Sequence, residues 1–297
     1  MSGKLKEVRD RIASINSTQQ ITSAMKMVSA AKLKKSQDAI IKIRPYANRL
    51  HKMLANVLAN LEGDISTKLH QKREINKVLL VVVTSNRGLC GAFNANIIKK
   101  AEKKILHEFA DLRAAGNLHL LCIGKKGYEH FSKHYKDCPI NKDYLFAFDH
   151  LSSATIHPIA DMLMDSYENG QYDLIEVAYA VFKNAAIQYP TLEQYLPIID
   201  YNPDTTAKQD YIANYIFEPD KHHLLSELIP NIMKSTFLKY MLDTNASEHG
   251  ARMSAMENAT ENARELLKDL KLEYNKARQE AITSELSEIV GGAAALS

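Results

Sequence analysis

The longest regular pattern in the sequence is an apolar stripe within its last residues, Asp243 to Ser297. Small and apolar side chains recur at alternating steps of four and three residues, the mean period of a seam between two helices. A helix of about 55 residues is roughly 80 Å long, more than a domain of this mass encloses, so we expect it to project. A projecting helix favours assembly or mechanical coupling over catalysis. The stripe comprises Met256, Thr260, Ala263, Leu267, Leu270, Tyr274, Ala277 and Ala281, then steps by one residue to Ile282, Leu286, Ile289 and Ala293.

A second long helix is predicted for residues 1–60, and its charge complements that of the C-terminal segment. Residues 1–60 contain twelve Lys or Arg and three acids, whereas residues 243–297 contain ten acids and six bases. Opposite charge favours pairing of the two segments in one antiparallel coiled coil; two independently solvated helices are the alternative. The predicted N-terminal face is interrupted by a polar stretch, 16–20, which requires a register shift or water contact. Its apolar members are Leu5, Val8, Ile12 and Ile15, and then Ile21, Met25 and Val28.

The middle of the chain alternates short apolar runs with helical segments, which indicates an α/β layer with a partly parallel sheet. We therefore expect a long antiparallel coiled coil of the N- and C-terminal helices (1–60 and 211–297) with an inserted Rossmann-like α/β domain (77–201). A polar linker is expected at 202–210, and Pro45 and Pro230 are expected to bend the helices that contain them. Strands are predicted at 78–83, 118–123, 172–182 and 195–199, and helices at 92–112, from 124 to 135 and at 154–167.

Composition narrows the classes of protein to which the chain can belong. The net charge of the 297 residues is only +3, so no overall field commits the chain to nucleic acid. The basic cluster Lys32, Lys34 and Lys35 lacks interleaved aromatic residues, which favours a solvated or protein-facing surface. Three widely spaced cysteines argue against a disulfide framework and fit a reducing compartment. The sequence has no signal core and no apolar run of membrane-spanning length, so we expect no bilayer crossing.

The best candidate for a small-molecule site is the turn 84–91, because it follows a buried strand and precedes a helix. It contains Gly88 and Gly91 but lacks the spacing of a dinucleotide or P-loop motif, so a tight turn is favoured, with Asn86 and Arg87 bonding locally or contacting a partner. No cofactor is expected.

Metal and catalytic sites are expected even less. His130, His134 and Cys138 share a helical spacing that suits a soft metal, but Pro139 ends the helix early and a fourth ligand is missing. A solvated helix face explains the carboxylate pair Asp161 and Asp165. A surface position at the start of a helix explains the adjacent histidines His222 and His223. No catalytic set is found.

Three segments resemble the gamma subunit of F-type ATP synthases. The C-terminal segment ITSELSEIVGGAAA (282–295) is similar to that family's signature, and IASINSTQQITSAMKMV (12–28) resembles its N-terminal helix. RGLCGAFN (87–94) resembles the first turn of its central domain. The likeness covers nearly the whole chain and is least distinctive at 137–149.

The resemblance implies a non-catalytic rotor shaft of the F1Fo ATP synthase. In that family the coiled coil stands inside the ring of three alpha and three beta subunits, and the α/β domain contacts epsilon and the c-ring. Ion flow, of protons or sodium, is coupled by rotation to ATP synthesis on beta, and the gamma subunit itself binds no nucleotide. The family further implies a bacterial-type protein, peripheral on the cytoplasmic side of the cell inner membrane. The spacing of Cys90, Cys122 and Cys138 does not match the regulatory pair of plastid members.

The resemblance also implies roles for individual residues in binding partners. Met25 and Lys26 match residues that face an acidic loop of beta. Glu248 and Arg252, in SEHGAR (247–252), match residues that form ion pairs with each other and with beta. Two further sets complete the implied contacts: Arg278 and Gln279 with a catch loop of beta, and Ile282, Leu286 and Ile289 with an apolar collar of the ring. A nucleotide-dependent enzyme and a generic coiled-coil scaffold are the competing hypotheses.

Overall fold

The computed structural model describes residues 2–59, 68–71, 73–149, 151–198 and 221–296. Two very long helices, α1 (Ser2–Ala59) and α6 (Lys221–Leu296), lie at the two ends of the chain. The chain divides into two compact units. We call residues 1–30 with 252–297 the rod unit, and residues 31–251 the sheet unit.

The sheet unit is built on five strands in the order β3-β2-β1-β4-β5. The strand β1 (Val78–Val83) lies in the middle, parallel to β2 (Leu118–Ile123) and β4 (Leu174–Phe182). The two-residue strand β3 (Ile140–Asn141) is parallel to β2, and β5 (Gln188–Leu196) is antiparallel to β4. Every residue of β1 is buried, as its continuous aliphatic sequence predicts for a strand covered on both faces. The predicted fold class, with a mixed and mainly parallel sheet between two long terminal helices, is confirmed.

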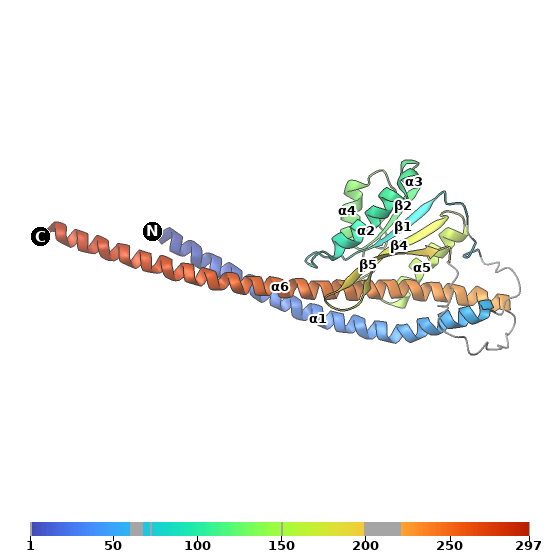
Figure 1. The fold of residues 1–297 in the computed structure, drawn as a ribbon, viewed down its shortest axis with the longest axis horizontal. Helices are drawn as coiled ribbons and strands as arrows, with labels where there is room; N and C mark the ends of the chain where they lie inside the picture. The colour runs from blue at the N-terminus through green and yellow to red at the C-terminus, as the bar shows by residue number, and fades with distance from the viewer. Residues whose placement is uncertain (1, 60–67, 72, 150, 199–220, 297) are drawn as a thin grey trace. The chain divides into compact units, whose positions relative to one another are not determined.

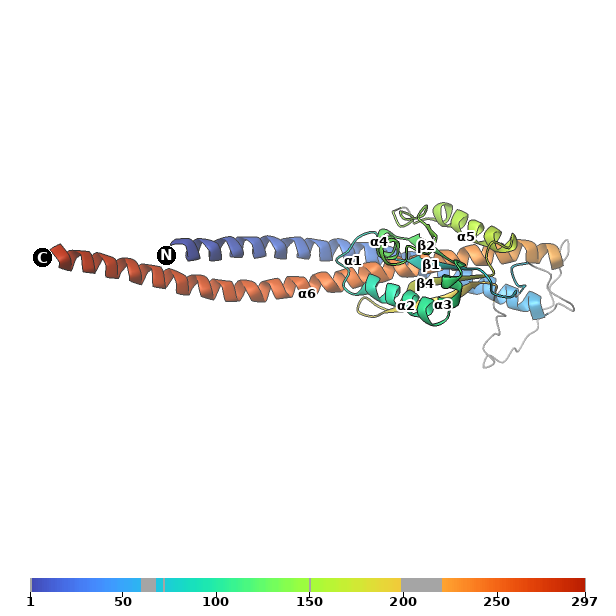
Figure 2. The same ribbon diagram turned by 90° about the horizontal axis from the view of Figure 1, so that it is seen from above.

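One face of the sheet is covered by α2 (Phe93–His107) and α4 (Lys125–His134). Because side chains alternate along a strand, Val78, Leu80 and Val82 all point to this face, where they join one apolar cluster. The short helix α3 (Ala110–Ala114) follows α2, and Figure 2 shows both on the side of the sheet opposite to α5 (Ser153–Glu168). The α/β layers are therefore held by a dense core on the α2 face.

The other face of the sheet is covered by the part of α6 that belongs to the sheet unit. The Tyr179 ring of β4 lies 4.3 Å from the Tyr240 ring of α6. Beyond the end of β1, the N–H of Ala180 donates to Thr244 Oγ1, and its carbonyl accepts from Ser247 Oγ. The helix thus supplies hydrogen bonds that a neighbouring strand provides elsewhere. The close approach is possible because Gly250 has no Cβ, which would lie 3.2 Å from the Ala185 backbone.

The rod unit consists of α1 from Ser2 to Ala30 lying against α6 from Arg252 onward (Figure 1). The seam of α6 follows the predicted stripe as far as Ala277, since Met256, Ala263, Leu267, Leu270 and Ala277 are all buried. The last members of the stripe, from Ile282 onward, are exposed and do not belong to the seam. The interhelical contacts run antiparallel, as predicted. In α1 the apolar face continues in phase through the polar stretch, and the buried or half-buried seam positions are Leu5, Val8, Ile12, Ile15, Gln19, Thr22, Lys26 and Ser29.

This register corrects the predicted N-terminal face. Ile21 and Val28 are 59% and 57% exposed, whereas their neighbours Thr22 and Ser29 are buried. No register shift takes place, because heptad spacing is kept by polar side chains, and phase rather than apolarity decides which side chains face α6. The Thr22 and Ser29 hydroxyls donate to backbone carbonyls one turn earlier, which satisfies them inside the seam.

Several other element boundaries differ from prediction. The expected helix 92–112 breaks at Glu108, because Phe109 turns into the core, where it is 4% exposed. The strand expected at 195–199 begins at Gln188 and ends at Leu196. Pro190 hides this strand in the sequence, yet β5 is an edge strand, where a missing N–H is tolerated.

The prolines within the long helices do not interrupt them. Both Pro45 and Pro230 lie inside helices that continue on either side. The polar linker expected at 202–210 lies outside the described residues.

Candidate functional site

Polar contacts join the two helices of the rod unit along its length. Residue numbers rise along α1 as they fall along α6, which is the signature of an antiparallel pair. The guanidinium of Arg9 donates to the hydroxyl of half-buried Tyr274 and lowers the pKa of Tyr274. The contacts are Lys4–Glu280 at 3.6 Å, Arg9–Tyr274 at 3.2 Å, Thr22–Thr260 at 2.8 Å and Lys26–Glu257 at 2.6 Å.

The end of α6 presents apolar side chains that the rod unit does not cover. Ile282, Leu286 and Ile289 are 48%, 58% and 66% exposed. The last described interhelical contact is that of Glu280, and Figure 2 shows the C-terminal end of α6 extending past the N-terminal end of α1. Arg278 and Gln279, just before this end, are also exposed. Five of the residues for which a partner-binding role is implied therefore lie on one open stretch of a single helix.

The remaining residues with an implied partner-binding role lie in α1 and in an earlier part of α6. Met25 is half-buried beside Lys26, whose ammonium is paired with Glu257. Glu248 and Arg252 are both 8% exposed. Glu248 belongs to the sheet unit and Arg252 to the rod unit.

The turn 84–91 is held by its own hydrogen bonds. Asn94 Oδ1 accepts from the Ser85 backbone N–H at 2.9 Å, and Asn86 Oδ1 accepts from the Lys125 N–H at 3.1 Å. Leu89 has a φ of 62°, in the left-handed region, and its side chain is 67% exposed. The tight turn thus rests on Leu89 and Gly91 (φ 59°) rather than on Gly88. The local bonding predicted for Asn86 is present.

The side chains weighed as metal ligands and as a carboxylate pair make other contacts. His130 Nε2 lies 2.9 Å from Glu102 Oε1, and His130 stacks on His134 with ring centres 4.5 Å apart. Cys138 lies beyond the end of α4 at His134 and is buried. Within the described ranges no group of three or more potential ligands is close enough to hold a metal ion. Asp161 forms an ion pair with Lys234 of α6, 2.8 Å apart, instead of facing only solvent.

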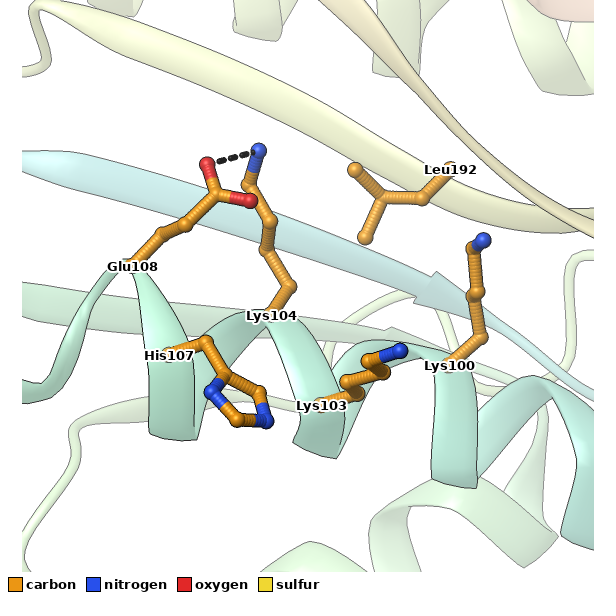
Figure 3. Close-up of a pocket in the computed structure, with 6 residues that line it drawn as sticks. All are labelled: Lys100, Lys103, Lys104, His107, Glu108 and Leu192. Carbon is orange, nitrogen blue, oxygen red and sulfur yellow. Dashed lines mark ion pairs between the residues drawn. The ribbon is translucent and has the colours of Figure 1, made fainter.

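Sequence reasoning missed a basic pocket between α2 and β5. The cavity measures about 320 Å³ and is lined by one face of α2 together with Leu192 of β5 (Figure 3). The spacing i, i+3, i+4 and i+7 in α2 is the signal that could have indicated it. Its lining residues are Lys100, Lys103, Lys104, His107, Glu108 and Leu192.

Comparison with known proteins gives one consistent result. A family model described as "ATP synthase" matches residues 4–296. The chain is 51% identical to the ATP synthase gamma chain of Cytophaga hutchinsonii and 50% identical to that of Flavobacterium johnsoniae, each alignment covering 98% of both chains. The gamma chain of Chlorobium chlorochromatii is 44% identical over the same shares.

Solved structures show the same fold. A chain of the Euglena gracilis mitochondrial ATP synthase, in a structure of OSCP, F1 and c-ring, matches with a TM-score of 0.66 and 20% identity, over 100% of this chain and 95% of that one. A chain of the Tetrahymena thermophila mitochondrial ATP synthase central stalk and c-ring has a TM-score of 0.56 and 23% identity, over 80% of this chain and 99% of that one. None of the helices in the described part of the chain is long and apolar enough to cross a membrane.

Proposed function

The chain belongs to the family of ATP synthase gamma chains, and we propose that it works as the non-catalytic rotor of the central stalk. In this role it turns within the alpha–beta ring and couples proton or sodium flow through the membrane ring to ATP synthesis on beta. The observation that carries the proposal is the open end of α6. The apolar side chains at this end take no part in the seam, whereas α6 from Arg252 to Glu280 is paired with α1.

The chemistry of this end suits a shaft that turns inside a sleeve. Apolar contact is non-directional, so Ile282, Leu286 and Ile289 can slide past a collar of the ring without breaking specific bonds. Directional contacts are placed earlier on the helix, where Arg278 and Gln279 are exposed and are proposed to bond a catch loop of beta. Exposed ion pairs hold at most about 1 kcal/mol each, so they can form and break with every step.

Other contacts with the ring are proposed at Met25 and Lys26, and at Glu248 and Arg252. Lys26 is paired with Glu257 in the free chain and would exchange this partner for an acidic group of beta. Because the faces of the rod differ, each beta subunit meets a different surface, and differential contacts of this kind can set different nucleotide affinities.

The remaining assignments complete the proposal. The coiled-coil segments are 1–60 and 211–297, and the α/β domain, 77–201, contacts epsilon and the c-ring. The protein is peripheral on the cytoplasmic side of the cell inner membrane. It has no nucleic-acid partner and needs no cofactor.

The test is assembly of the tagged full chain with its alpha and beta subunits. We expect the chain to retrieve both in fixed proportion, with an ATPase activity that it lacks alone. Arg278→Ala should weaken retrieval, and removal of residues 281–297 should weaken it more. Arg264→Ala serves as the matched control, because Arg264 is also exposed on α6 and pairs only with a neighbour on its own helix, Glu261, in the described structure.

A second pair of variants separates the apolar end from general surface apolarity. Leu286→Ser with Ile289→Ser should impair assembly, whereas Leu106→Ser with Phe146→Ser removes similarly exposed apolar side chains of the sheet unit and should not. Circular dichroism checks that each variant keeps its helices. Unchanged assembly and coupling after truncation at Ala281 would refute the proposal.

A further inference from the structure

The pocket between α2 and β5 carries more positive charge than its own carboxylates balance. Lys104 is its anchored member, since its ammonium lies 2.5 Å from Glu108 Oε2 and 3.1 Å from Glu176 Oε1. Lys100 and Lys103 form no ion pair within the described part of the chain. Like charges three or four residues apart on a helix repel each other. An anion seated among them would relieve this repulsion.

The pocket combines exposed side chains with one fixed wall: Lys100, Lys103 and His107 are exposed, whereas Lys104 and Leu192 are half-buried. Figure 3 shows Lys100 extending from α2 toward the strand that carries Leu192, with Lys104 turned toward Glu108 and His107 one turn further on. Leu192 is half-buried against the sheet core and forms an apolar wall. Glu176, 5% exposed, forms an ion pair with Lys104, and this contact fixes the Lys104 side of the cavity.

We propose that this pocket binds a phosphate group, presented either by a small soluble phosphate compound or by the headgroup of an anionic phospholipid. Lys100 and Lys103 provide the free ammonium donors, Lys104 offsets the charge of Glu108 and Glu176 at the pocket wall, and His107 adds a ring nitrogen. A phosphate carries more than one negative charge and several acceptor oxygens, so it can engage two lysines at once, which a single carboxylate does less well. A cavity of about 320 Å³ is large enough to hold such a group.

The proposal goes beyond the stalk role and is tested without the alpha–beta ring. The purified full chain is titrated with inorganic phosphate and with ADP by calorimetry, at fixed salt, because exposed charges are screened. In a second arm it is sedimented with vesicles of neutral phosphatidylcholine, with or without anionic phosphatidylglycerol. Saturable binding in the first arm identifies a soluble source, and binding only to the anionic vesicles identifies the lipid headgroup.

Matched variants locate the binding. Lys100→Gln with Lys103→Gln should weaken it about a hundredfold, because each substitution removes one charge-assisted hydrogen bond that contributes about tenfold. Lys99→Gln with Lys133→Gln removes the same charge from exposed lysines outside the pocket and should change it less than about twofold. Replacing Lys100 and Lys103 by Arg should retain binding. Lys104 is left intact because it compensates Glu176.

Three results would overturn the assignment. The first is the absence of saturable binding in both arms. The second is an equal loss in the two glutamine pairs, which would mean unspecific attraction to a basic surface. The third is tighter binding of a short poly-glutamate peptide than of phosphate, which would assign the pocket to acidic protein segments instead.

Discussion

The rod unit and the sheet unit both bury aliphatic side chains, but to different depths and with different neighbours. All six residues of β1 are at most 3% exposed and are enclosed by strands and helices. In the rod unit the leucines of the α6 seam, Leu267 and Leu270, are 8% and 6% exposed, and hydroxyls and an ammonium occupy several facing positions of α1. A seam between two helices has open flanks, so it excludes water from one line of contacts only. The sheet unit therefore encloses the aliphatic side chains of β1 completely and is rigid. The rod unit leaves apolar surface along its flanks that a partner can cover.

The same truncation in both units gives the largest expected effect. Leu80→Ala deletes a fully buried side chain from the sheet core and should cost about 3–5 kcal/mol, because a closed core cannot collapse around the cavity. Leu270→Ala should cost about 2 kcal/mol, at the low end of the range, because the seam flanks can relax. Since the units need not unfold together, native-state hydrogen exchange should be read separately in each.

Leu272→Ala is the control for that experiment, because its side chain is 64% exposed on the same helix, and its effect should stay within about 0.5 kcal/mol. Equal losses for Leu80→Ala and Leu270→Ala would show that the rod is as tightly packed as the sheet, and the contrast between the units would be lost.

Sequence predicted the fold well where pattern and burial coincide. The β1 run is uniformly apolar, and the α6 stripe keeps small or apolar side chains at almost every step of its period, so both can be predicted from the sequence. The α1 face predicted from apolar residues is wrong at Ile21 and Val28, because heptad phase relative to the partner helix decides which side chains face the seam. The start of β5 at Gln188 lies outside the predicted strand because its first residues form no continuous apolar run and include Pro190, which an edge strand tolerates.

The candidate site was predictable only in part. The open end of α6 does not follow from the period of its stripe, because the stripe continues through Ile282, Leu286 and Ile289, which α1 leaves exposed. The residue roles are implied by resemblance to a family. The basic pocket depends on Glu176 and Leu192, which lie far along the chain from α2, and on the sheet order, which the sequence left open. Contacts between distant segments of this kind are set by tertiary structure and leave no local pattern.

A smaller effect is expected where the sheet unit departs from its own apolar rule, at Glu176. Burial raises the pKa of this carboxyl above its ordinary 4.5, although Lys104 opposes the shift. Burial also lowers the pKa of Lys104, but its hydrogen bonds to Glu108 and Glu176 outweigh this and raise it. Desolvation therefore destabilises the charged form of Glu176 more than its ion pair with Lys104 stabilises it. The Oε2 atom of Glu176 has no hydrogen-bond partner among the described residues.

The sign of the pH dependence follows from this direction. A folded state with a raised carboxyl pKa binds the proton more tightly than the unfolded chain, so Glu176 lowers stability as the pH rises from about 4.5 through the raised pKa. Glu176→Gln should therefore gain stability relative to the natural chain over this interval, by about 1–2 kcal/mol at neutral pH. Unfolding by denaturant at a series of pH values measures the difference.

Glu108→Gln removes the exposed partner of the same lysine and provides the matched control, with an expected change within about 0.5 kcal/mol. If Glu176→Gln is instead destabilising at neutral pH, the ion pair of Glu176 and Lys104 contributes net stability. The buried carboxylate would then stabilise the sheet unit as its apolar residues do.

The smallest effect is expected at the hydroxyl pair of the rod seam, Thr22 and Thr260. Their oxygens lie 2.8 Å apart, and both groups can also donate to carbonyls of their own helices. Replacing both by Val keeps the shape and removes both polar groups together, so no donor is left unsatisfied, and stability of the rod unit should be unchanged or higher by less than about 1 kcal/mol. Thr283→Val, an exposed hydroxyl on α6 that bonds its own helix, is the control. Hydrogen exchange of the rod unit measures the effect. A loss greater than about 1 kcal/mol would show that the hydroxyl pair fixes the register of the two helices. The polar seam positions would then stabilise the rod unit by themselves, without a partner.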